Sequence, residues 1–430
     1  MRDISLVIIF VSILPMVFVY PFGGILCWTW LTLMNPHREV YGFAYGRPFN
    51  LVVAVLTLGA WLASRRRDGW PPGAMPWLIL ALLAWMTVNS FFAADPDWSW
   101  PLWEETVKVF VLVLAVLVSA RTKARIHALV WVLVVSLAYY GVKGGVFTVL
   151  TGGTYRVYGP EKSVLGDNNH LALAIAMTLP LVNYLRLHTA SPLLRLGLAF
   201  AFAIQILTVL GSYSRGGVIA LACALGFFWL RSRRKWAYLL AGSILLPMAL
   251  GLMPEAFFER MHSITAADHD TSFLGRVTSW QVCFSYAVDH FPFGAGFAGT
   301  QRTAVYNFYF PAEFPHAAHS IYFQILGEHG FPGLLLYLAL MVMAFAECRT
   351  VVRQSRGRNG LRWAGELARM IQVSLVTFWI GGAALSMAYY DGYLILLVLP
   401  SALRALTALP RPAQSAVQRE KGRKAALGTV

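Results

Sequence analysis

The sequence predicts an all-α polytopic membrane protein of about 12 transmembrane helices, with one large hydrophilic loop that contains an amphipathic helix. Hydrophobic residues make up 58% of the 430 residues, charged residues only 13%, and the mean hydropathy is +0.59. A soluble domain carries about a quarter charged residues. Apolar stretches of roughly 17–25 residues, long enough to cross a bilayer, recur along the whole chain. We therefore expect lipid to surround most of this protein.

The apolar stretches define the predicted spans. They lie at about 4–34, 48–64, 75–93, 103–120, 126–149, 168–186, 195–212, 216–230, 236–252, 320–346, 367–388 and 392–408. The first stretch is long for one helix and contains Pro15 and Pro21, so it forms either a kinked helix or a helical hairpin, which would give thirteen spans. It lacks a small-residue cleavage site, and we interpret it as a retained membrane segment.

The connecting loops alternate in charge. Basic loops such as 65–67 and 121–125 alternate with acidic or mixed loops such as 95–105. Because Lys and Arg gather in the cytoplasmic loops of membrane proteins, this alternation assigns the sides of the membrane. An even number of spans puts both termini in the cytoplasm. The same asymmetry accounts for the net charge of +15, so we expect no nucleic-acid partner.

The one sizeable hydrophilic segment is the loop at about 253–319, on the non-cytoplasmic side. Within it, an apolar stripe at helical spacing opposes a polar stripe. The apolar residues are Phe273, Val277, Trp280, Phe284, Ala287, Val288 and Phe291, and the polar stripe has Arg276, Ser279, Cys283, Tyr286 and His290. This pattern predicts an amphipathic helix that lies on the membrane with its apolar face down. The tail 409–430 is basic, and we expect it to be disordered and cytoplasmic.

A first candidate site is the segment 211–217, at the non-cytoplasmic start of a span. Ser214 is a good N-cap, so the free N–H groups and the positive end of the helix dipole would face the membrane surface. Arg215 adds a permanent charge whose planar fork suits phosphate oxygens. The segment therefore predicts an anion site, in which Tyr213 and Ser214 would contact the ligand. The plainer alternative is that Arg215 reaches to lipid headgroups.

A second candidate site is the segment 315–320, which also precedes a span on that side. The positive end of the following helix opposes protonation of His319 and keeps it neutral near pH 7, as a general base requires. The alternative is that His319 only caps the helix. In addition, His316 lies three residues earlier, on the same helix face, so His316 could be the base in place of His319. Glu328 would lie about 13.5 Å further along a helix, on the opposite face, so we expect no metal site.

The remaining polar clusters point to the same face of the membrane. Arg156 and Lys162 would bind phosphate or sugar, and Asn168 or Asn169 would either cap the next helix or contact the ligand beside His170. Together with the preceding sites, they gather cations and one potential base, which suits an anionic leaving group and a hydroxyl nucleophile. The four cysteines have no C-x-x-C spacing, so neither a zinc site nor a disulfide framework is expected.

These residues resemble the O-antigen ligase superfamily, which also contains O-antigen polymerases and protein O-oligosaccharyltransferases. The resemblance is carried by 214–217 (Ser-Arg-Gly-Gly), by His319 and Ser320 with Gln324, Glu328 and Gly330, and by Gly275 and Arg276 in the large loop. The opening of the chain is more specific. Its segments 21–24, 34–38 and 42–46, together with 166–170, are similar to the O-glycosylation ligases associated with exosortase A systems.

The resemblance implies one transmembrane glycan-ligase domain over 1–408, in a bacterial inner membrane, with the loop 253–319 and the active site on the periplasmic face. It implies an undecaprenyl-pyrophosphate-linked glycan as donor, a lipid, protein or glycan acceptor, surrounding membrane lipids, and no cofactor or metal. His319 would take the proton of the acceptor hydroxyl, while Arg215 and Arg276 would neutralise the leaving pyrophosphate, with inversion at the sugar. The candidate substrate-binding residues are Arg156, Lys162, Asn169, His170, Tyr213, Ser214 and His316.

Two alternatives remain open from the sequence. A polymerase of the same superfamily would use a second lipid-linked glycan as acceptor, and its motifs would look the same. A transporter of lipid-linked sugars belongs to a different class, and charged residues within spans, such as Lys108 and Lys143, would be its sign.

Overall fold

The computed structural model describes residues 2–64, 69–231, 235–262, 271–311 and 313–408, and within them every regular element is a helix. The predicted all-α fold is therefore confirmed. The longer helices are α1 (Arg2–Val19), α2 (Pro21–Met34), α3 (Phe49–Ala63), α4 (Met75–Phe91), α5 (Pro96–Ser119), α6 (Lys123–Leu150), α7 (Asn168–His188), α8 (Pro192–Gly211), α9 (Arg215–Arg231), α10 (Lys235–Gly251), α14 (Ile321–Gln354), α15 (Arg362–Gly382) and α16 (Asp391–Ala408). The predicted disordered tail, 409–430, lies outside the described residues.

Six described helices are long and apolar enough to cross a membrane: α1, α6, α7, α8, α14 and α16. The other expected spans fall short for two reasons. Helices such as α3 and α4 are apolar but have only 15 and 17 residues. Helices α5 and α15 are longer but carry several charges, including Glu104 and Lys108 in α5. A multi-pass membrane protein is thus supported, while the number of spans stays a prediction.

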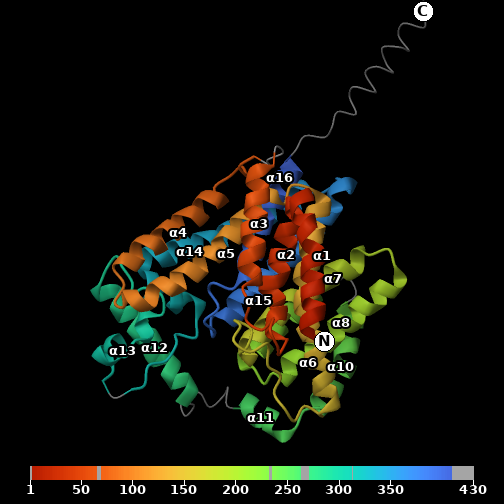
Figure 1. Ribbon diagram of the computed structural model, residues 1–430. Helices are drawn as coiled ribbons and strands as arrows, with labels where there is room; N and C mark the ends of the chain where they lie inside the picture. The colour runs from red at the N-terminus through yellow and green to blue at the C-terminus, as the bar shows by residue number, and fades with distance from the viewer. Residues whose placement is uncertain (1, 65–68, 232–234, 263–270, 312, 409–430) are drawn as a thin grey trace, which may run out of the picture.

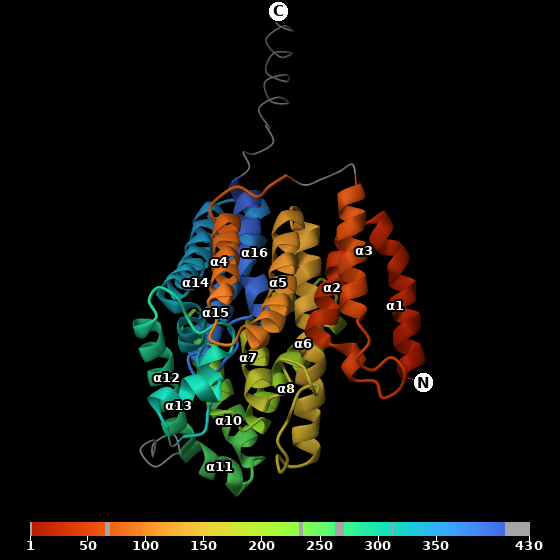
Figure 2. The ribbon, with the colours of Figure 1, turned by 60° about the vertical axis from the view of Figure 1, so that its left-hand side comes forward.

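The first apolar stretch folds as a helical hairpin, which is the second of the two alternatives. Helices α1 and α2 pack together and run in opposite directions. The Asp3 carboxylate at the start of α1 accepts hydrogen bonds from the N–H groups of Gly42 and Ala44, which follow α2. At the other end, the Tyr20 hydroxyl between the helices accepts a hydrogen bond from Arg125. The start of α1 and the end of α16 therefore lie at opposite ends of the bundle, whereas an even number of spans would have put them at the same end (Figure 2).

The bundle has two polar ends. We call the end that carries residues 252–320 the loop end, and the end that carries residues 355–361 and 404–408 the tail end; Figures 1 and 2 show them at the bottom and the top. The loop end contains three short helices, α11 (Glu255–His262), η3 (Gly299–Gln301) and α13 (Thr303–Tyr309), and the longer α12 (Thr271–Asp289). Segments 151–167 and 212–214 join it through the bond from the Tyr213 hydroxyl to the Gly153 carbonyl, and through the packing of Tyr213 on Phe257 of α11.

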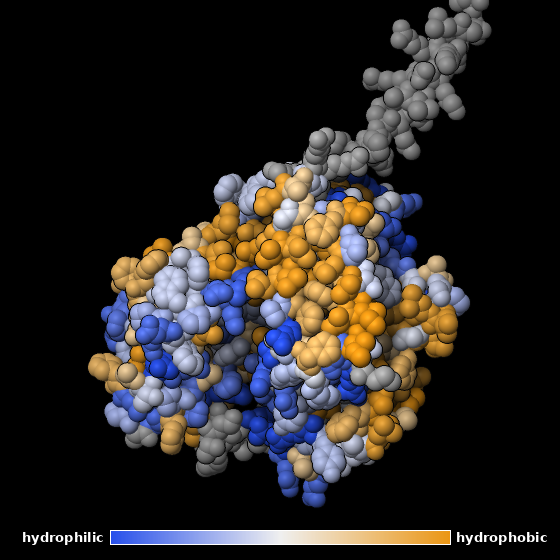
Figure 3. Space-filling view, in the orientation of Figure 1, coloured by the Kyte–Doolittle hydropathy of each residue, from blue (hydrophilic) through white to orange (hydrophobic). Residues whose placement is uncertain are grey.

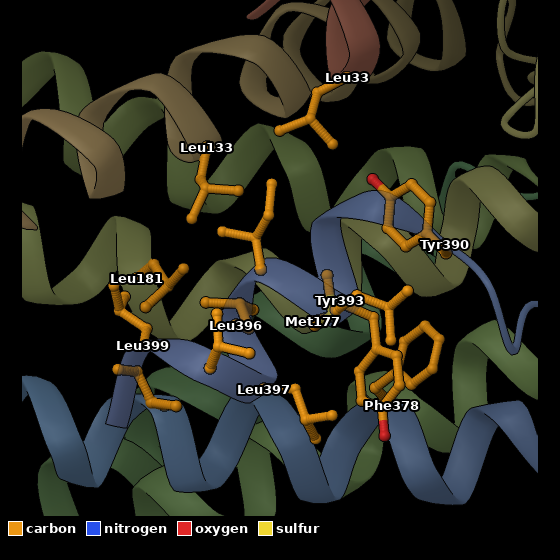
Figure 4. Close-up of a cluster of buried hydrophobic side chains, with 14 of the residues drawn as sticks. Leu33, Leu133, Met177, Leu181, Phe378, Tyr390, Tyr393, Leu396, Leu397 and Leu399 are labelled. Carbon is orange, nitrogen blue, oxygen red and sulfur yellow. The ribbon is translucent and has the colours of Figure 1, made fainter. Parts of the chain in front are cut away.

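Helices α7 and α16 form the centre of the bundle. Helix α7 contacts α6, α8, α9 and α15, while α16 contacts α5, α14 and α15. Figure 4 shows side chains of α16 among those of its neighbours: Leu396, Leu397 and Leu399 with Leu133, Met177, Leu181 and Phe378. In a bilayer, such helices associate by close van der Waals packing, because lipid is as apolar as the side chains. The outer helix α1 is instead mostly exposed, as expected for contact with lipid.

The surface follows the same division. In the view of Figure 3, hydrophobic residues gather over the upper part of the molecule, and hydrophilic residues gather where α12 and α13 lie. An apolar belt beside polar ends is the pattern of a protein that spans a bilayer.

Helix α12 confirms the predicted amphipathic helix and shows where its two faces point. The polar stripe is turned inwards, since Ser279, Cys283 and Tyr286 are buried against neighbours that include α13 and α14. The apolar stripe is turned outwards, with Phe284 and Val288 about half exposed. The outer face is therefore suited to lipid, while the polar face packs on protein instead of facing water.

Candidate active site

The three candidate segments lie at the N-terminal ends of α7, α9 and α14, all at the loop end (Figure 1). Helix α7 packs against α9, and α15 packs against α7, α9 and α14, so the three ends belong to one packed unit. Each helix begins after a turn that carries the polar residues singled out by the sequence. Since N–H groups at helix starts have no partner within the helix, this end of the bundle is suited to anionic ligands.

His319 lies in a strained turn just before α14. Its φ of 44° is in the left-handed region, which is uncommon for a residue other than glycine. The carbonyl of the preceding Ala318 accepts a 2.6 Å hydrogen bond from the indole of Trp280 in α12, and that indole stacks on Phe323 of α14. These contacts fix the turn between two helices and hold the half-buried imidazole in place. Strain of this kind gathers at functional sites.

The environment of His319 keeps its ring neutral. Burial and then the charge of Arg276 lower the pKa of His319 to about 4, His170 and His316 lower it further, and the Asp167 carboxylate opposes them. The Nδ1 atom is buried and makes no hydrogen bond to the described residues. The ring therefore offers an unprotonated nitrogen near neutral pH. The same electrostatic effects show that the structure brings together α12, the start of α7 and the turn before α14.

Gly275 and Arg276 bring α12 to the two histidines. The ring of His316 packs directly on Gly275, where an added Cβ would lie 3.3 Å from the imidazole Cδ2. The carbonyl of His316 also lies 3.4 Å from the Ser279 hydroxyl, at the limit of a hydrogen bond. His316 itself is exposed, whereas His319 is half-buried. The two histidines therefore differ in environment, which the sequence alone did not show.

The turn before α9 has the predicted cap. The Ser214 hydroxyl accepts a 3.0 Å hydrogen bond from the Gly217 N–H, and Ser214 is fully buried. Arg215, the first residue of α9, is half-buried. Tyr213 is also buried, and its hydroxyl donates a hydrogen bond to the Gly153 carbonyl, so its side chain supports the turn. The guanidinium of the exposed Arg156 lies 5.5 Å from the centre of the Tyr213 ring.

At the start of α7, Asp167 is the N-cap residue, so the prediction that Asn168 or Asn169 caps this helix is wrong. The Asp167 carboxylate accepts hydrogen bonds from the N–H groups of Asn169 and His170. The Asn168 side chain donates to the Ser212 carbonyl and so ties α7 to the turn before α9. Asp167 was available in the sequence as an equally good N-cap residue, one position earlier. Asn169 and His170 lie half-buried at the helix start.

The Lys162 side chain lies beside the segment that follows α2. Its ammonium lies 5.9 Å from the centre of the Tyr45 ring, in the segment that follows α2. That segment borders a cavity of about 660 Å³ whose lining includes Arg38, Arg47 and Lys143. The segment 159–166 separates this cavity from His170, because Pro160 lines the cavity while the Val164 carbonyl contacts the His170 ring at 2.9 Å. Lys162 therefore lies at a neighbouring cavity, beyond the residues that surround His319.

The helix α14 is broken at Gly330, whose φ of 67° and ψ of −172° are not helical. The backbone of 292–296 fills the break: the N–H groups of Ala295 and Gly296 donate to the carbonyls of Gly327 and Glu328. A side chain at position 330 would overlap the Pro292 carbonyl. The large loop is thus attached to α14, the helix that follows His319.

A buried network supports this attachment. The Glu328 carboxylate accepts hydrogen bonds from the Ala298 N–H and the Tyr389 hydroxyl, and the Tyr389 oxygen lies 2.7 Å from His329 Nε2. Asn89 of α4 bridges the loop and the helix, donating to the Glu328 carbonyl and accepting from the Gly294 N–H. The sequence marked Tyr389 only as part of a polar turn at 389–391 and did not single out Asn89, and it linked neither residue to Glu328, which is far away in the chain. Only Gly330 and Pro332, close together in an apolar stretch, signalled the break.

Metal ligands are not grouped here. The described residues contain no cluster of three or more His, Cys, Asp or Glu side chains that could hold a metal ion. All four cysteines are free thiols. The charged and titratable groups around His319 are Arg276, His170, His316 and the Asp167 carboxylate.

Comparison with known proteins supports a family for residues 200–338. The family described as O-Antigen ligase matches residues 200–338, which include Arg215, Arg276, His316 and His319. A family of unknown function, DUF5935, matches residues 1–190. No curated protein matched. The match over 200–338, about a third of the chain, supports the O-antigen ligase superfamily, whose members include ligases and polymerases.

Proposed function

Starting from an O-antigen ligase domain at 200–338, we propose that this chain is a glycan ligase that transfers a glycan from undecaprenyl pyrophosphate to an acceptor hydroxyl. The observation that carries the proposal is the neutral, half-buried His319, held in a strained turn within electrostatic reach of Arg276. We place the reaction at the loop end, on the periplasmic face of a bacterial inner membrane. The basic loops at the tail end, such as 355–362, support this orientation.

The proposed reaction is a single displacement at the first sugar of the donor. The acceptor oxygen forms a bond to the sugar carbon, while the bond from that carbon to the pyrophosphate oxygen breaks, with inversion. His319 takes the proton of the acceptor hydroxyl and later releases it to water. The leaving group departs as an undecaprenyl pyrophosphate anion. Stabilisation must therefore fall on the developing negative charge, which arginine side chains can provide.

Arg215 and Arg276 are the proposed stabilisers. Arg215 starts α9, where the helix dipole adds positive potential, and Arg276 starts the second turn of α12 beside the histidines.

A low pKa makes His319 a weak base in the unliganded protein. When the pyrophosphate arrives, its negative charge offsets that of Arg276, so the pKa of His319 rises towards neutrality. Donor binding would thus activate the base, because the effect of Arg276 is the second largest on this histidine.

The other candidate residues take supporting roles in the proposal. Asn169 and His170 would contact the donor at the start of α7, Ser214 and Tyr213 would position Arg215, and His316 would contact the acceptor. Arg156, exposed and 5.5 Å from the ring of Tyr213, would bind phosphate or sugar near Arg215, and Lys162, which lies over Tyr45, would bind a more distant sugar residue. No cofactor is required, because the arginines supply the charge.

The similarity of the N-terminal segments to O-glycosylation ligases of exosortase A systems supports a ligase in preference to a polymerase. The transporter alternative loses its two basic candidates, because Lys108 pairs with Glu104 at 2.7 Å and Lys143 with Glu39 at 2.9 Å. The Lys108 pair has the i,i+4 spacing that stabilises a helix, and the Lys143 pair joins α6 to the segment after α2, so structural roles for both lysines favour the ligase.

Reconstitution tests the proposal. Purified protein in vesicles receives an undecaprenyl-pyrophosphate-linked glycan with lipid, peptide or glycan acceptors, and the products are analysed by mass. We expect a glycan–acceptor conjugate that forms equally in the presence of a chelator and that is lost in His319→Ala. Glycans lengthened on the donor lipid would identify a polymerase instead. Movement of intact donor across the membrane without any new bond would identify a transporter.

A further inference from the structure

At the tail end, two adjoining cavities are lined mainly by arginine. The first, of about 260 Å³, lies at the turn between α14 and α15, and its lining includes Arg356, Arg358, Arg362 and Arg369. The second, of about 500 Å³, lies between α9, α14 and α15 and is lined by Arg349, Arg353 and again Arg356. Because Arg356 lines both, the two cavities adjoin at this residue, and we call them the arginine cavities.

The charge of the arginine cavities is strongly positive. Among the described residues that line them, six are arginines and Glu366 is the one acid. Glu366 is already engaged on both oxygens, by Arg362 at 2.8 Å and by His188 at 2.9 Å. The remaining arginines therefore leave a surplus of positive charge around a hollow. Guanidinium groups in such a setting are suited to phosphate oxygens, which they bind through two parallel N–H bonds.

The second cavity also has an apolar floor. Phe345 comes one helical turn before Arg349 in α14, and Phe227 comes one turn before the end of α9. One turn is about 5.4 Å, so both rings lie deeper in the membrane than the arginines. The cavities are therefore basic near the membrane surface and apolar towards its centre. A soluble anion would need only the basic part, whereas a phospholipid has both parts in this order.

We propose that the arginine cavities bind an anionic phospholipid, with its phosphate held by Arg356 and its neighbours and an acyl chain along Phe345 and Phe227. The topological preference for basic cytoplasmic loops explains positive charge at this end, but it requires neither a hollow nor an apolar floor. Basic pockets between transmembrane helices are a recognised form of headgroup site. The site lies at the opposite end from His319, so the proposal is independent of glycan transfer.

The test is lipid retention by the full-length protein. The purified protein is equilibrated with cardiolipin, phosphatidylglycerol, undecaprenyl phosphate or phosphatidylcholine, and bound lipid is counted by native mass spectrometry. We expect the protein to retain more of each anionic lipid than of phosphatidylcholine. The amounts retained of the three anionic lipids then show which of them the cavities prefer. In the double variant Arg356→Lys/Arg369→Lys, retention should fall about tenfold, because lysine keeps the charge and thus the topology but loses the planar fork.

The matched control is Arg186→Lys/Arg195→Lys, two arginines at the same end and outside the arginine cavities, which contact Asn183 and the Thr189 carbonyl. Retention by the control should equal that of the parent. Equal losses in both double variants, or equal retention of phosphatidylcholine, would overturn the proposal. Displacement of the lipid by inorganic phosphate alone would show a site for free anions and would also overturn it.

Discussion

At the scale of single residues, the two histidines of 315–320 are distinguished by burial and backbone. His319 is half-buried in a left-handed turn, while His316 is exposed and packs on Gly275. We expect His319→Ala to lower single-turnover transfer by about 10²–10⁴-fold, as for a positioned general base, with donor affinity largely kept. His316→Ala should be milder. Donor binding and transfer are measured for both variants, with folding checked alongside; an inactive His316→Ala beside an active His319→Ala would reverse the roles.

The electrostatic link between Arg276 and His319 gives a pH prediction. Arg276 lowers the pKa of His319, so Arg276→Gln should raise that pKa from about 4 towards its ordinary value. A higher pKa means more protonated, inactive histidine at a given acidic pH. The acid limb of kcat/KM for the free enzyme should therefore move to higher pH in the variant, whatever its absolute rate. Arg302→Gln, a change to an arginine that pairs with Asp95, serves as control; identical limbs in parent and Arg276→Gln would argue against the link.

At the scale of elements, the break in α14 at Gly330 is the feature that attaches the backbone of residues 292–296 to this helix. Gly330 has a φ and ψ that are nearly exclusive to glycine, and a Cβ there would overlap the Pro292 carbonyl. Gly330→Ala should lower the melting temperature and the transfer rate together, with strain of at least about 1–3 kcal/mol. The control is Gly226→Ala in α9, where an added Cβ meets nothing within 4 Å. Equal melting temperatures of the two variants would contradict this role of Gly330.

The elements also show what local sequence can and cannot predict. The apolar stretches and the Ser214 cap depend on neighbouring residues, and the structure has both. The network of Asn89, Glu328 and Tyr389 joins distant segments, so no local pattern could reveal it. For α12, hydropathy gave the two stripes but could not tell whether water or protein covers the polar one. The sequence placed Lys162 and His319 at the same end of the bundle, but it could not show that the Lys162 ammonium lies over Tyr45, in the segment that follows α2.

At the scale of the whole molecule, the hairpin of α1 and α2 sets the sides of the chain. Asp3 is bonded to residues 42 and 44, so the start of α1 lies at the loop end. Reporters placed before Asp3 and at Gly152 should therefore be on one side of the membrane, and reporters at Gly69 and Gly357 on the other. Reporter activity in intact cells checks this. A cytoplasmic signal at Gly152 would remove the basis for a periplasmic site.

The outward apolar face of α12 has a mechanical consequence. Phe284 and Val288 face the surroundings, while Trp280 of the same helix holds the residue before His319. We expect the thickness of the bilayer to set the depth at which α12 rests, because apolar side chains follow the hydrocarbon boundary. Turnover should therefore depend on acyl-chain length, with an optimum and a loss in both thinner and thicker bilayers. Reconstitution in phosphatidylcholines of increasing chain length, at constant headgroup, measures this, and substitution of Trp280 by Phe should flatten the dependence.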